Sequence, residues 1–149
     1  MTNLPLLFRS ATIIALAGLL FPLMLRAQAP KPMSLPQTLR ASQWKKRVLL
    51  VAAPNAQQAD FRQQQALLAS QQAALAERDF LVLPVLYEQL SAADTQFLTR
   101  EIGIKPPAFA VVLIGKDGGV KERSSRPMQP ENLFGTVDKM PMRRQEMRK

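Results

Sequence analysis

Three methionines near the C-terminus are the residues of this chain that most readily suggest chemistry. Met140 and Met142 flank Pro141, and Met147 follows a few residues later. Thioether sulfurs are soft ligands, and closely spaced methionines can hold monovalent copper. Methionine is also an adaptable filler of small cores. The segment therefore indicates either a weak copper site or a turn of the chain at Pro141 that packs both flanking side chains inward.

Basic residues follow the same segment to the end of the chain. They are Arg143, Arg144, Arg148 and Lys149. Cations in the last turn of a helix are stabilised by the helix dipole, so a capped helix end is the simplest interpretation. The same side chains would attract an acidic protein or an anionic lipid. If this segment is a partner surface, we expect an exposed patch at Arg143 and Arg144.

A second charged segment is the run Gly115–Gly119. The amides of Asp117, Gly118 and Gly119, with Lys116 beside them, can form a backbone nest for a phosphate. A tight hairpin turn requires the same glycines for positive φ, and the turn is the interpretation we favour. Lys116 and Asp117 remain candidates for a surface that contacts a ligand or partner.

The chain contains no Cys and no His. Without a thiol it has neither a redox couple nor a cysteine nucleophile. Without imidazole it lacks the commonest general base and transition-metal ligand. The 11 carboxylates show no spacing that selects an acid/base pair, and Glu77 and Asp79 beside Arg78 indicate local charge pairing. The composition argues against an enzyme, and we predict no catalytic residue and no cofactor.

The first 29 residues have the pattern of an export signal. Arg9 precedes an apolar run over residues 11–25, and Ala27-Gln28-Ala29 offers a cleavage site after Ala29. The apolar run is shorter than the roughly 20 residues that span a bilayer. The sequence therefore predicts a periplasmic or secreted protein. An uncleaved signal that anchors the chain in the inner membrane is the alternative.

The net charge is strongly basic, at +9 for the whole chain of 149 residues. Residues 1–29 hold two of the 20 basic residues and none of the 11 acidic ones, so their removal leaves about +7. An exported protein meets little nucleic acid, and we predict none as a partner. An unidentified protein or an anionic component of the cell envelope is the expected partner.

One domain is expected over residues 44–149, after a proline-containing linker over residues 30–43. Trp44 begins this domain, and Trp44 and Tyr87 are expected at the edge of its core.

Hydrophobic patterning predicts the order of elements in this domain. A continuous apolar run over 48–53 indicates a strand buried on both faces. Asp60 is the expected N-cap of a helix over 61–78, whose glutamines, including Gln64, fall on a solvated face. Residues 80–87 form a second strand, which Pro84 restricts to a sheet edge.

The second half continues the alternation. Ser91 and Asp94 predict the start of a helix that ends at Gly103. A strand over 104–114 and a returning strand over 120–123 make an antiparallel hairpin. Pro130 opens a last helix, which Pro141 ends or kinks. The order β-α-β-α-β-β-α is typical of the thioredoxin-like α/β sandwich, with a four-stranded mixed sheet flanked by helices.

Two runs, FAVVLIGKDGGVKER and VDKMPMRRQEM, give this chain a resemblance to a family. They resemble the exported bacterial proteins of the domain of unknown function 4174 family, which has related domains in sushi-repeat proteins and in a coiled-coil-domain-containing matrix protein. The family motif is carried by Gly115, Lys116, Asp117, Gly118, Gly119, Asp138, Met140, Pro141, Met142 and Arg143.

The resemblance implies a thioredoxin-like fold that is distantly akin to the peroxiredoxins. Redox members of that fold place their cysteines just after the first strand, where this chain has Pro54–Gln58. Their cis-proline is matched in position by Pro107 or Pro106. The missing thiols argue against peroxidase or oxidoreductase activity by the usual mechanism.

These observations favour an exported, non-catalytic domain that acts as a binding or structural module. Two alternatives remain open, namely an unconventional peroxiredoxin-related enzyme that lacks cysteine and a periplasmic methionine-rich copper protein.

Overall fold

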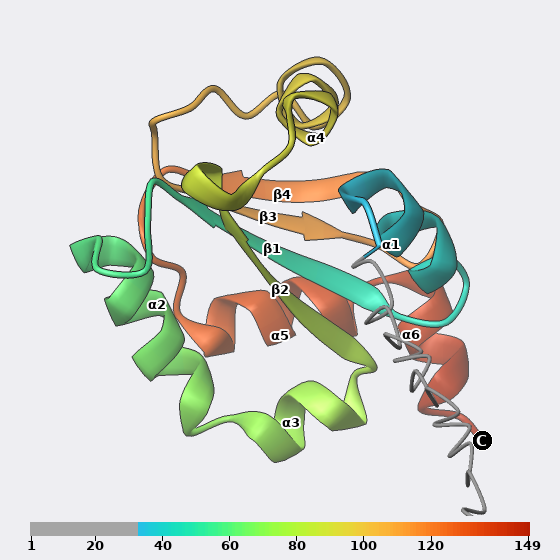
Figure 1. Cartoon of the computed structure of the whole chain (residues 1–149). Helices are drawn as coiled ribbons and strands as arrows, with labels where there is room; N and C mark the ends of the chain where they lie inside the picture. The colour runs from blue at the N-terminus through green and yellow to red at the C-terminus, as the bar shows by residue number, and fades with distance from the viewer. Residues whose placement is uncertain (1–32) are drawn as a thin grey trace, which may run out of the picture. The chain divides into compact units, whose positions relative to one another are not determined.

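A computed structural model describes residues 33–149, which contain a four-stranded mixed sheet with helices on both faces (Figure 1). The strands are β1 (Arg47–Ala53), β2 (Phe80–Leu86), β3 (Ala110–Ile114) and β4 (Val120–Ser124), in the order β2-β1-β3-β4. β1 and β2 are parallel, whereas β3 is antiparallel to both β1 and β4. The predicted four-stranded mixed sheet is therefore confirmed.

The predictions for residues 1–29, including the signal and its cleavage after Ala29, lie outside the described residues. Within 33–149, the structure contains no helix with the length and apolar character needed to span a bilayer.

The helices form a layer on each side of the sheet. α2 (Ala59–Ala69), α3 (Gln72–Glu77) and α5 (Pro130–Asp138) lie below the sheet in Figure 1. α1 (Leu35–Ser42) and α4 (Ala92–Phe97) lie above it. A π-helical turn, η2 (Leu98–Ile102), continues α4, and a short 3-10 turn, η1 (Tyr87–Gln89), follows β2. α6 (Pro141–Glu146) lies beside the amino-terminal end of β1.

β1 supplies both hydrophobic cores, and all seven of its residues are buried. Leu49, Val51 and Ala53 point into the core under α2, α3 and α5. Val48, Leu50 and Ala52 point into the opposite core with residues of α1 and α4. A continuous apolar run is what a strand covered on both faces requires. Both cores and all four strands fall within one compact unit, Pro32–Lys149, so this part of the chain contains everything needed to fold alone.

β2 lies at the sheet edge, as Pro84 predicted. It pairs only with β1, and Pro84 stands opposite Val51 in that ladder. Proline lacks an N–H, and an edge strand leaves alternate N–H groups without a partner strand in any case.

The predicted linker over residues 30–43 is wrong in part, because α1 occupies Leu35–Ser42. Pro36 lies in the first helical turn, where a missing N–H costs no hydrogen bond. Leu35 is buried in the core beside α4, and its N–H donates to Asp94 Oδ1 at 3.0 Å. The proline that indicates a linker in the sequence thus begins a packed helix.

The predicted helix over 61–78 is two helices, because the helical conformation is interrupted between Ala69 and Gln72. Its N-cap is Gln58 and not Asp60, since Gln58 Oε1 accepts a hydrogen bond from Phe61 N at 2.7 Å. The cap predicted at Ser91 is confirmed, with Asp94 N donating to Ser91 Oγ at 3.1 Å, and Gly103 ends η2 in the left-handed conformation.

Pro141 does not only end the preceding helix. α5 ends at Asp138, and Pro141 occupies the first turn of α6. The fixed φ of proline suits a first helical turn, so a residue that stops one helix starts the next. α6 brings Arg143 and Glu146 to the end of the sheet.

Candidate functional site

The sheet has two ends with different residues. At one end lie Arg47, which begins β1, Asp79, which precedes β2, and Lys116, which follows β3. We call this the motif end, because both runs of the family motif reach it. At the other end lie Pro54–Gln58 after β1 and Pro106-Pro107 before β3. We call that the reaction end, because redox members of the fold place their cysteines there.

The motif end is built from an ion-pair cluster of four cations and four carboxylates. Its members come from the starts of β1 and β2, the end of β3, and helices α3, α5 and α6: they are Arg47, Glu77, Arg78, Asp79, Lys116, Asp138, Arg143 and Glu146. The charges in this cluster balance, so burying them leaves no net charge uncompensated.

Glu146 holds the centre of the ion-pair cluster. Its carboxylate accepts two hydrogen bonds from Arg47, both at 3.2 Å, and one from Lys116 Nζ at 2.7 Å. Lys116 Nζ also donates to Asp79 Oδ2 at 2.8 Å. Arg47 is only 1% exposed and Lys116 only 9%. Glu146 therefore fastens α6 to two strands through two cations that have little access to water.

Arg143 and Asp138 form the second half of the cluster. Arg143 donates to Glu77 Oε1 at 2.6 Å, to the Glu77 carbonyl at 3.1 Å and to Asp138 Oδ1 at 3.3 Å. Arg78 contacts both oxygens of Asp138, at 3.0 and 2.8 Å, and its guanidinium lies 4.6 Å from the centre of the Phe134 ring. Such bidentate pairs fix geometry as well as charge.

The pKa shifts in the cluster all favour the charged forms. Hydrogen bonds from Lys116 and from Arg78 lower the pKa values of Asp79 and Asp138, respectively. Burial alone would raise the pKa of Glu146 and lower that of Lys116, but their hydrogen bonds outweigh burial and shift both values the other way. A general acid or base needs a pKa near the working pH, and these groups move away from neutrality. The cluster is suited to holding structure and not to transferring protons.

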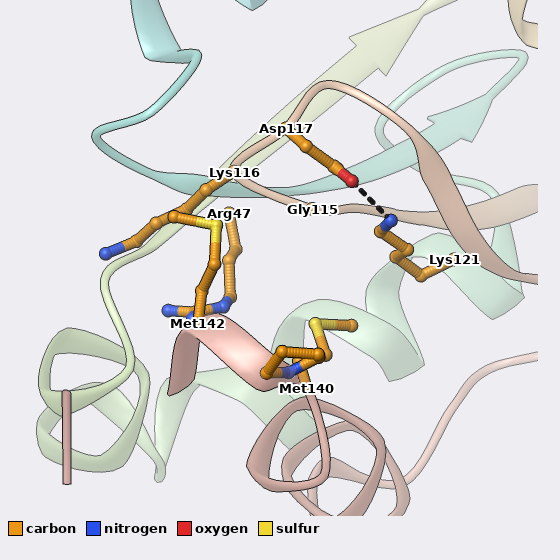
Figure 2. Close-up of a pocket in the computed structure, with 8 residues that line it drawn as sticks. Arg47, Gly115, Lys116, Asp117, Lys121, Met140 and Met142 are labelled. Carbon is orange, nitrogen blue, oxygen red and sulfur yellow. Dashed lines mark hydrogen bonds and ion pairs between the residues drawn. The ribbon is translucent and has the colours of Figure 1, made fainter. Parts of the chain in front are cut away.

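A pocket of about 180 Å³ opens beside this cluster (Figure 2). Six of its eight lining residues belong to the motif: Gly115, Lys116 and Asp117 from the β3–β4 turn, and Met140, Pro141 and Met142 from the start of α6. Arg47 and Lys121 complete the lining. The two motif runs, residues 109–123 and 137–147, are separated in the sequence, and here they form opposite walls of one pocket.

The pocket is mainly apolar, with charges at its margins. Lys121 Nζ donates to Asp117 Oδ2 at 2.7 Å, the pair joined by the dashed line in Figure 2. That hydrogen bond lowers the pKa of Asp117. Arg47 Nε is buried and has no hydrogen-bond partner among the described residues. One wall residue thus carries an unsatisfied donor, which is unusual in a folded protein.

The structure contradicts the predicted exposed patch at Arg143 but not at Arg144. Arg143 is 5% exposed and its guanidinium is used by Glu77 and Asp138. Lys116, another candidate for a partner surface, is buried in the cluster. Arg144, Arg148 and Asp117 are exposed, as a partner surface requires. Lys116 and Arg143 therefore hold the fold together, whereas Arg144 and Arg148 are exposed to a partner; the exposed Asp117 already accepts hydrogen bonds from Lys121 and Gly119.

The three methionines do not share one location. Met140 and Met142 both line the pocket, and Met140 also packs against the core under the sheet. Met147 is 53% exposed and is not among the residues that line the pocket. The sequence offered two interpretations of these methionines, copper binding and packing. Packing accounts for Met140. Of the described His, Cys, Asp and Glu residues, no three are grouped so as to hold a metal ion.

The run Gly115–Gly119 forms the predicted hairpin turn, and its amides are already used. Gly118 N donates to Gly115 O at 2.9 Å, and Gly119 N donates to Asp117 Oδ1 at 3.0 Å. Gly118 has φ of 83°, which a residue with a side chain rarely adopts. A phosphate nest would need these N–H groups unpaired, so the nest interpretation is wrong.

At the reaction end, polar groups serve local structure. Asn55 Oδ1 accepts a hydrogen bond from Gln57 N at 3.0 Å, and Gln58 caps α2. The Tyr87 hydroxyl donates to the Ala108 carbonyl, and burial raises the pKa of Tyr87 to about 12. The Pro106-Pro107 peptide bond is cis, in the position that the resemblance indicated. The side chains of Asn55 and Gln58 thus bond to groups within three positions of themselves, with Gln58 Nε2 donating to Asp60 Oδ2 at 3.2 Å.

This fold defines the class of protein. Solved structures similar to it include the reduced 2-Cys peroxiredoxin of Plasmodium vivax, with a TM-score of 0.55 and 16% identity over 73% of this chain and 84% of that one. Thioredoxin peroxidase I of Plasmodium yoelii gives a TM-score of 0.54 at 16% identity, over 73% of this chain and 79% of that one. At that identity the likeness concerns the fold alone, and the predicted thioredoxin-like fold is confirmed.

The chain belongs to the family described as Domain of unknown function (DUF4174), which it matches over residues 38–146. The predicted resemblance is confirmed. A relative is the coiled-coil domain-containing protein 80 of Danio rerio, 30% identical over 141 residues. The match covers 78% of this chain but only 16% of that much longer protein.

Sequence reasoning missed Arg47 and Glu146 as members of the site. A cation directly before a fully apolar strand was a usable signal for Arg47, because an arginine there must be either exposed or paired. Glu146 lies three residues after Arg143 on one helical face. Its contacts with β1 and β3 come from residues 99 and 30 positions away, and no local pattern encodes them.

Proposed function

We propose that this chain is an exported, non-catalytic binding domain that contacts a protein or an anionic component of the cell envelope at the motif end. The observation that carries this proposal is the convergence of both motif runs on one pocket, beside a charge-balanced ion-pair cluster. A rigid wall with an apolar hollow and a charged margin is suited to recognition.

Two features support a non-catalytic role. Asn55, Gln57 and Gln58 stand where redox members of the fold have cysteines, and their polar groups hold the start of α2. In the ion-pair cluster, the pKa values of Asp79, Asp138 and Glu146 are lowered, away from neutrality. Both ends of the sheet therefore lack a group prepared for proton transfer or sulfur chemistry at neutral pH.

Export is supported by the sequence of residues 1–29 and is tested separately. Whole cells that produce the full chain would be converted to spheroplasts and treated with a protease that does not cross the inner membrane. We expect the domain to be released with the periplasm or degraded on the spheroplast surface. A protected domain that is degraded only after lysis would contradict export.

Binding at the motif end is tested by site-specific photocrosslinking in the same cells. A photoreactive amino acid would replace Lys121 at the pocket margin or Arg144 on α6, both of which are exposed. Matched control positions are Gln57 at the reaction end and Arg62 on α2, which are also exposed. We expect discrete crosslinked products from positions 121 and 144 only. Products of equal yield from position 57 would move the binding surface to the reaction end and contradict the proposal.

A further inference from the structure

Trp44, the only tryptophan of the chain, is unusually exposed for so large an apolar side chain. It lies between α1 and β1, and it is 64% exposed instead of lying at the edge of the core as predicted. Its φ is 65°, in the left-handed region that bulky residues rarely adopt. A residue held in such a conformation at a surface points to a role outside the core.

The backbone around Trp44 is held by the motif turn. Trp44 N donates to Lys116 O at 2.6 Å, and Gln43 Nε2 donates to Asp117 O at 3.0 Å. Gly118 lies against Gln43, where an added Cβ would approach Gln43 Nε2 to 3.3 Å. Lys46 N donates to Ser42 O at 2.8 Å and closes the turn. The exposure of Trp44 is therefore fixed by hydrogen bonds on both sides and does not come from a loose loop.

Cations surround this tryptophan in the sequence and at the same end of the sheet. Lys45 and Lys46 follow it directly, and both are exposed. Lys46 lies 3.6 Å from Asp79, but both side chains are well exposed, so this pair is weak. Glu146 fastens α6 to Lys116 at this end, and the exposed Arg148 follows two residues after that helix.

We propose that Trp44, Lys45 and Lys46 form a membrane-docking surface for the headgroup region of an anionic bilayer. An indole combines an apolar ring with one N–H donor and is enriched at the membrane–water interface. Adjacent lysines pair with lipid phosphates and keep the ring at that depth. Trp44 is not among the residues lining the motif pocket, so this surface is distinct from that pocket.

A lipid surface fits these residues better than a protein partner does. A single aromatic ring flanked by lysines has charge complementarity to a flat anionic surface. The apolar run over residues 11–25 ends fewer than 20 residues before Trp44, a length of chain that spans at most about 50 Å because Leu35–Ser42 is helical. This argument rests on the proposed export, because an exported chain with that leader passes beside a membrane.

The single tryptophan makes the proposal directly measurable. Residues 30–149 would be mixed with vesicles of phosphatidylglycerol and phosphatidylethanolamine, or with phosphatidylcholine vesicles. Omitting residues 1–29 removes the apolar run, which would itself enter a bilayer. With the anionic vesicles we expect a blue shift of Trp44 emission, protection from acrylamide quenching and reversal by 0.5 M salt, since Debye screening at that concentration is on the order of 4 Å. No shift with anionic vesicles would overturn the proposal.

Charge variants distinguish vesicle binding through Lys45 and Lys46 from attraction that depends only on the net basic charge. Lys45→Glu/Lys46→Glu is expected to weaken vesicle binding at least tenfold, as two phosphate-pairing cations are lost. Arg100→Glu/Lys105→Glu changes the net charge equally at exposed positions near the reaction end and is the matched control. Equal weakening by both variants would contradict a specific surface. A shift with an acidic peptide but not with vesicles would also contradict it, in favour of a protein partner.

Failure of this proposal and failure of the proposed function are distinguishable. Met142→Ala alters the pocket without changing charge, and we expect it to leave vesicle binding intact. If it abolished vesicle binding, Trp44 would not act as an independent surface. Crosslinking at position 121 tests the pocket whether or not vesicles bind.

Discussion

The two ends of the sheet use their polar residues in opposite ways. At the reaction end, Asn55 and Gln58 are neutral side chains that hydrogen-bond to residues within three positions of themselves. At the motif end, Arg47 and Glu146 are charged side chains that pair across 99 positions. Short-range contacts hold one helix start, whereas long-range contacts join strands and helices that are distant in the chain.

The difference indicates where this chain places its long-range polar contacts. In this chain, which has no thiol, the reaction end holds the cap of α2 and the half-buried Tyr87, whose hydroxyl donates to the Ala108 carbonyl. The motif end retains residue types that cannot be exchanged freely, because a buried cation without its partner is costly. We infer that the motif is retained in this chain for a rigid wall and the pocket beside it.

Removing the central carboxylate should give the largest effect. Glu146→Gln keeps the shape but leaves Arg47 and Lys116 without their shared anion. We expect a loss of about 3 kcal/mol in the free energy of unfolding, at the low end of the ~3–5 kcal/mol for a broken buried pair because Glu146 is partly exposed. Urea denaturation measures the loss as a lower midpoint at constant m-value.

The matched control for that variant is Glu101→Gln on η2. Glu101 is exposed, so its substitution should change stability by less than about 0.5 kcal/mol. Similar losses in the two variants would show that Glu146 is not special and would remove the contrast between the two ends.

Acid should weaken the motif end by a smaller amount. The pKa values of Asp79, Asp138 and Glu146 are lowered in the folded state. Their contribution is therefore present above the ordinary values of 3.8 and 4.5 and is lost as pH falls through the folded values. Down to about pH 4 we expect a loss of less than about 1 kcal/mol, because groups with lowered pKa values stay largely charged there, and the loss approaches that of Glu146→Gln only at lower pH.

The opposite sign applies at alkaline pH. The pKa of Lys116 is raised above 10.5, so its contribution is complete below that value and disappears as pH rises through the folded value.

The acid prediction is tested by urea midpoints measured from pH 2 to 7. These midpoints should fall less steeply with decreasing pH for Glu146→Gln than for the unmodified chain. Identical acid slopes would contradict the role of Glu146.

The reaction end should respond only locally. Gln58→Ala removes the side-chain acceptor for Phe61 N, and loss of such a cap costs about 1 kcal/mol. Hydrogen exchange should report faster opening at the start of α2 and unchanged protection in α6. Gln63→Ala, an exposed position on the same helix, is the control. Faster exchange in α6 after Gln58→Ala would show that the two ends are coupled.

Several elements of this fold were predicted correctly because short runs of neighbouring residues determine them. The apolar run of β1, the edge position of Pro84 and the cap at Ser91 each follow from a few neighbouring residues. The β3–β4 turn followed from its glycines, because positive φ at Gly118 requires one. These elements were sufficient to indicate a thioredoxin-like sheet.

Two of the errors, those at Gln64 and Arg143, share a cause, which is packing against distant segments. Gln64 has the polarity of a solvated face, yet it is fully buried because its amide exchanges two hydrogen bonds with the backbone of Met128, 64 positions away. Arg143 looks like part of an exposed basic tail until Glu77 is brought beside it by the fold. Contacts with distant residues determine the exposure of both side chains. Hydrophobic periodicity and residue spacing along the sequence do not reveal such contacts.

The central claim is that the reaction end of this thioredoxin-like domain no longer performs sulfur chemistry. The direct measurement is turnover of hydrogen peroxide and of a dithiol substrate by purified residues 30–149, with a 2-Cys peroxiredoxin as positive control. We predict rates equal to those of buffer at every protein concentration. A rate that rises with protein concentration and saturates with substrate, and that is reduced by Gln58→Ala but not by Glu101→Gln, would contradict the claim.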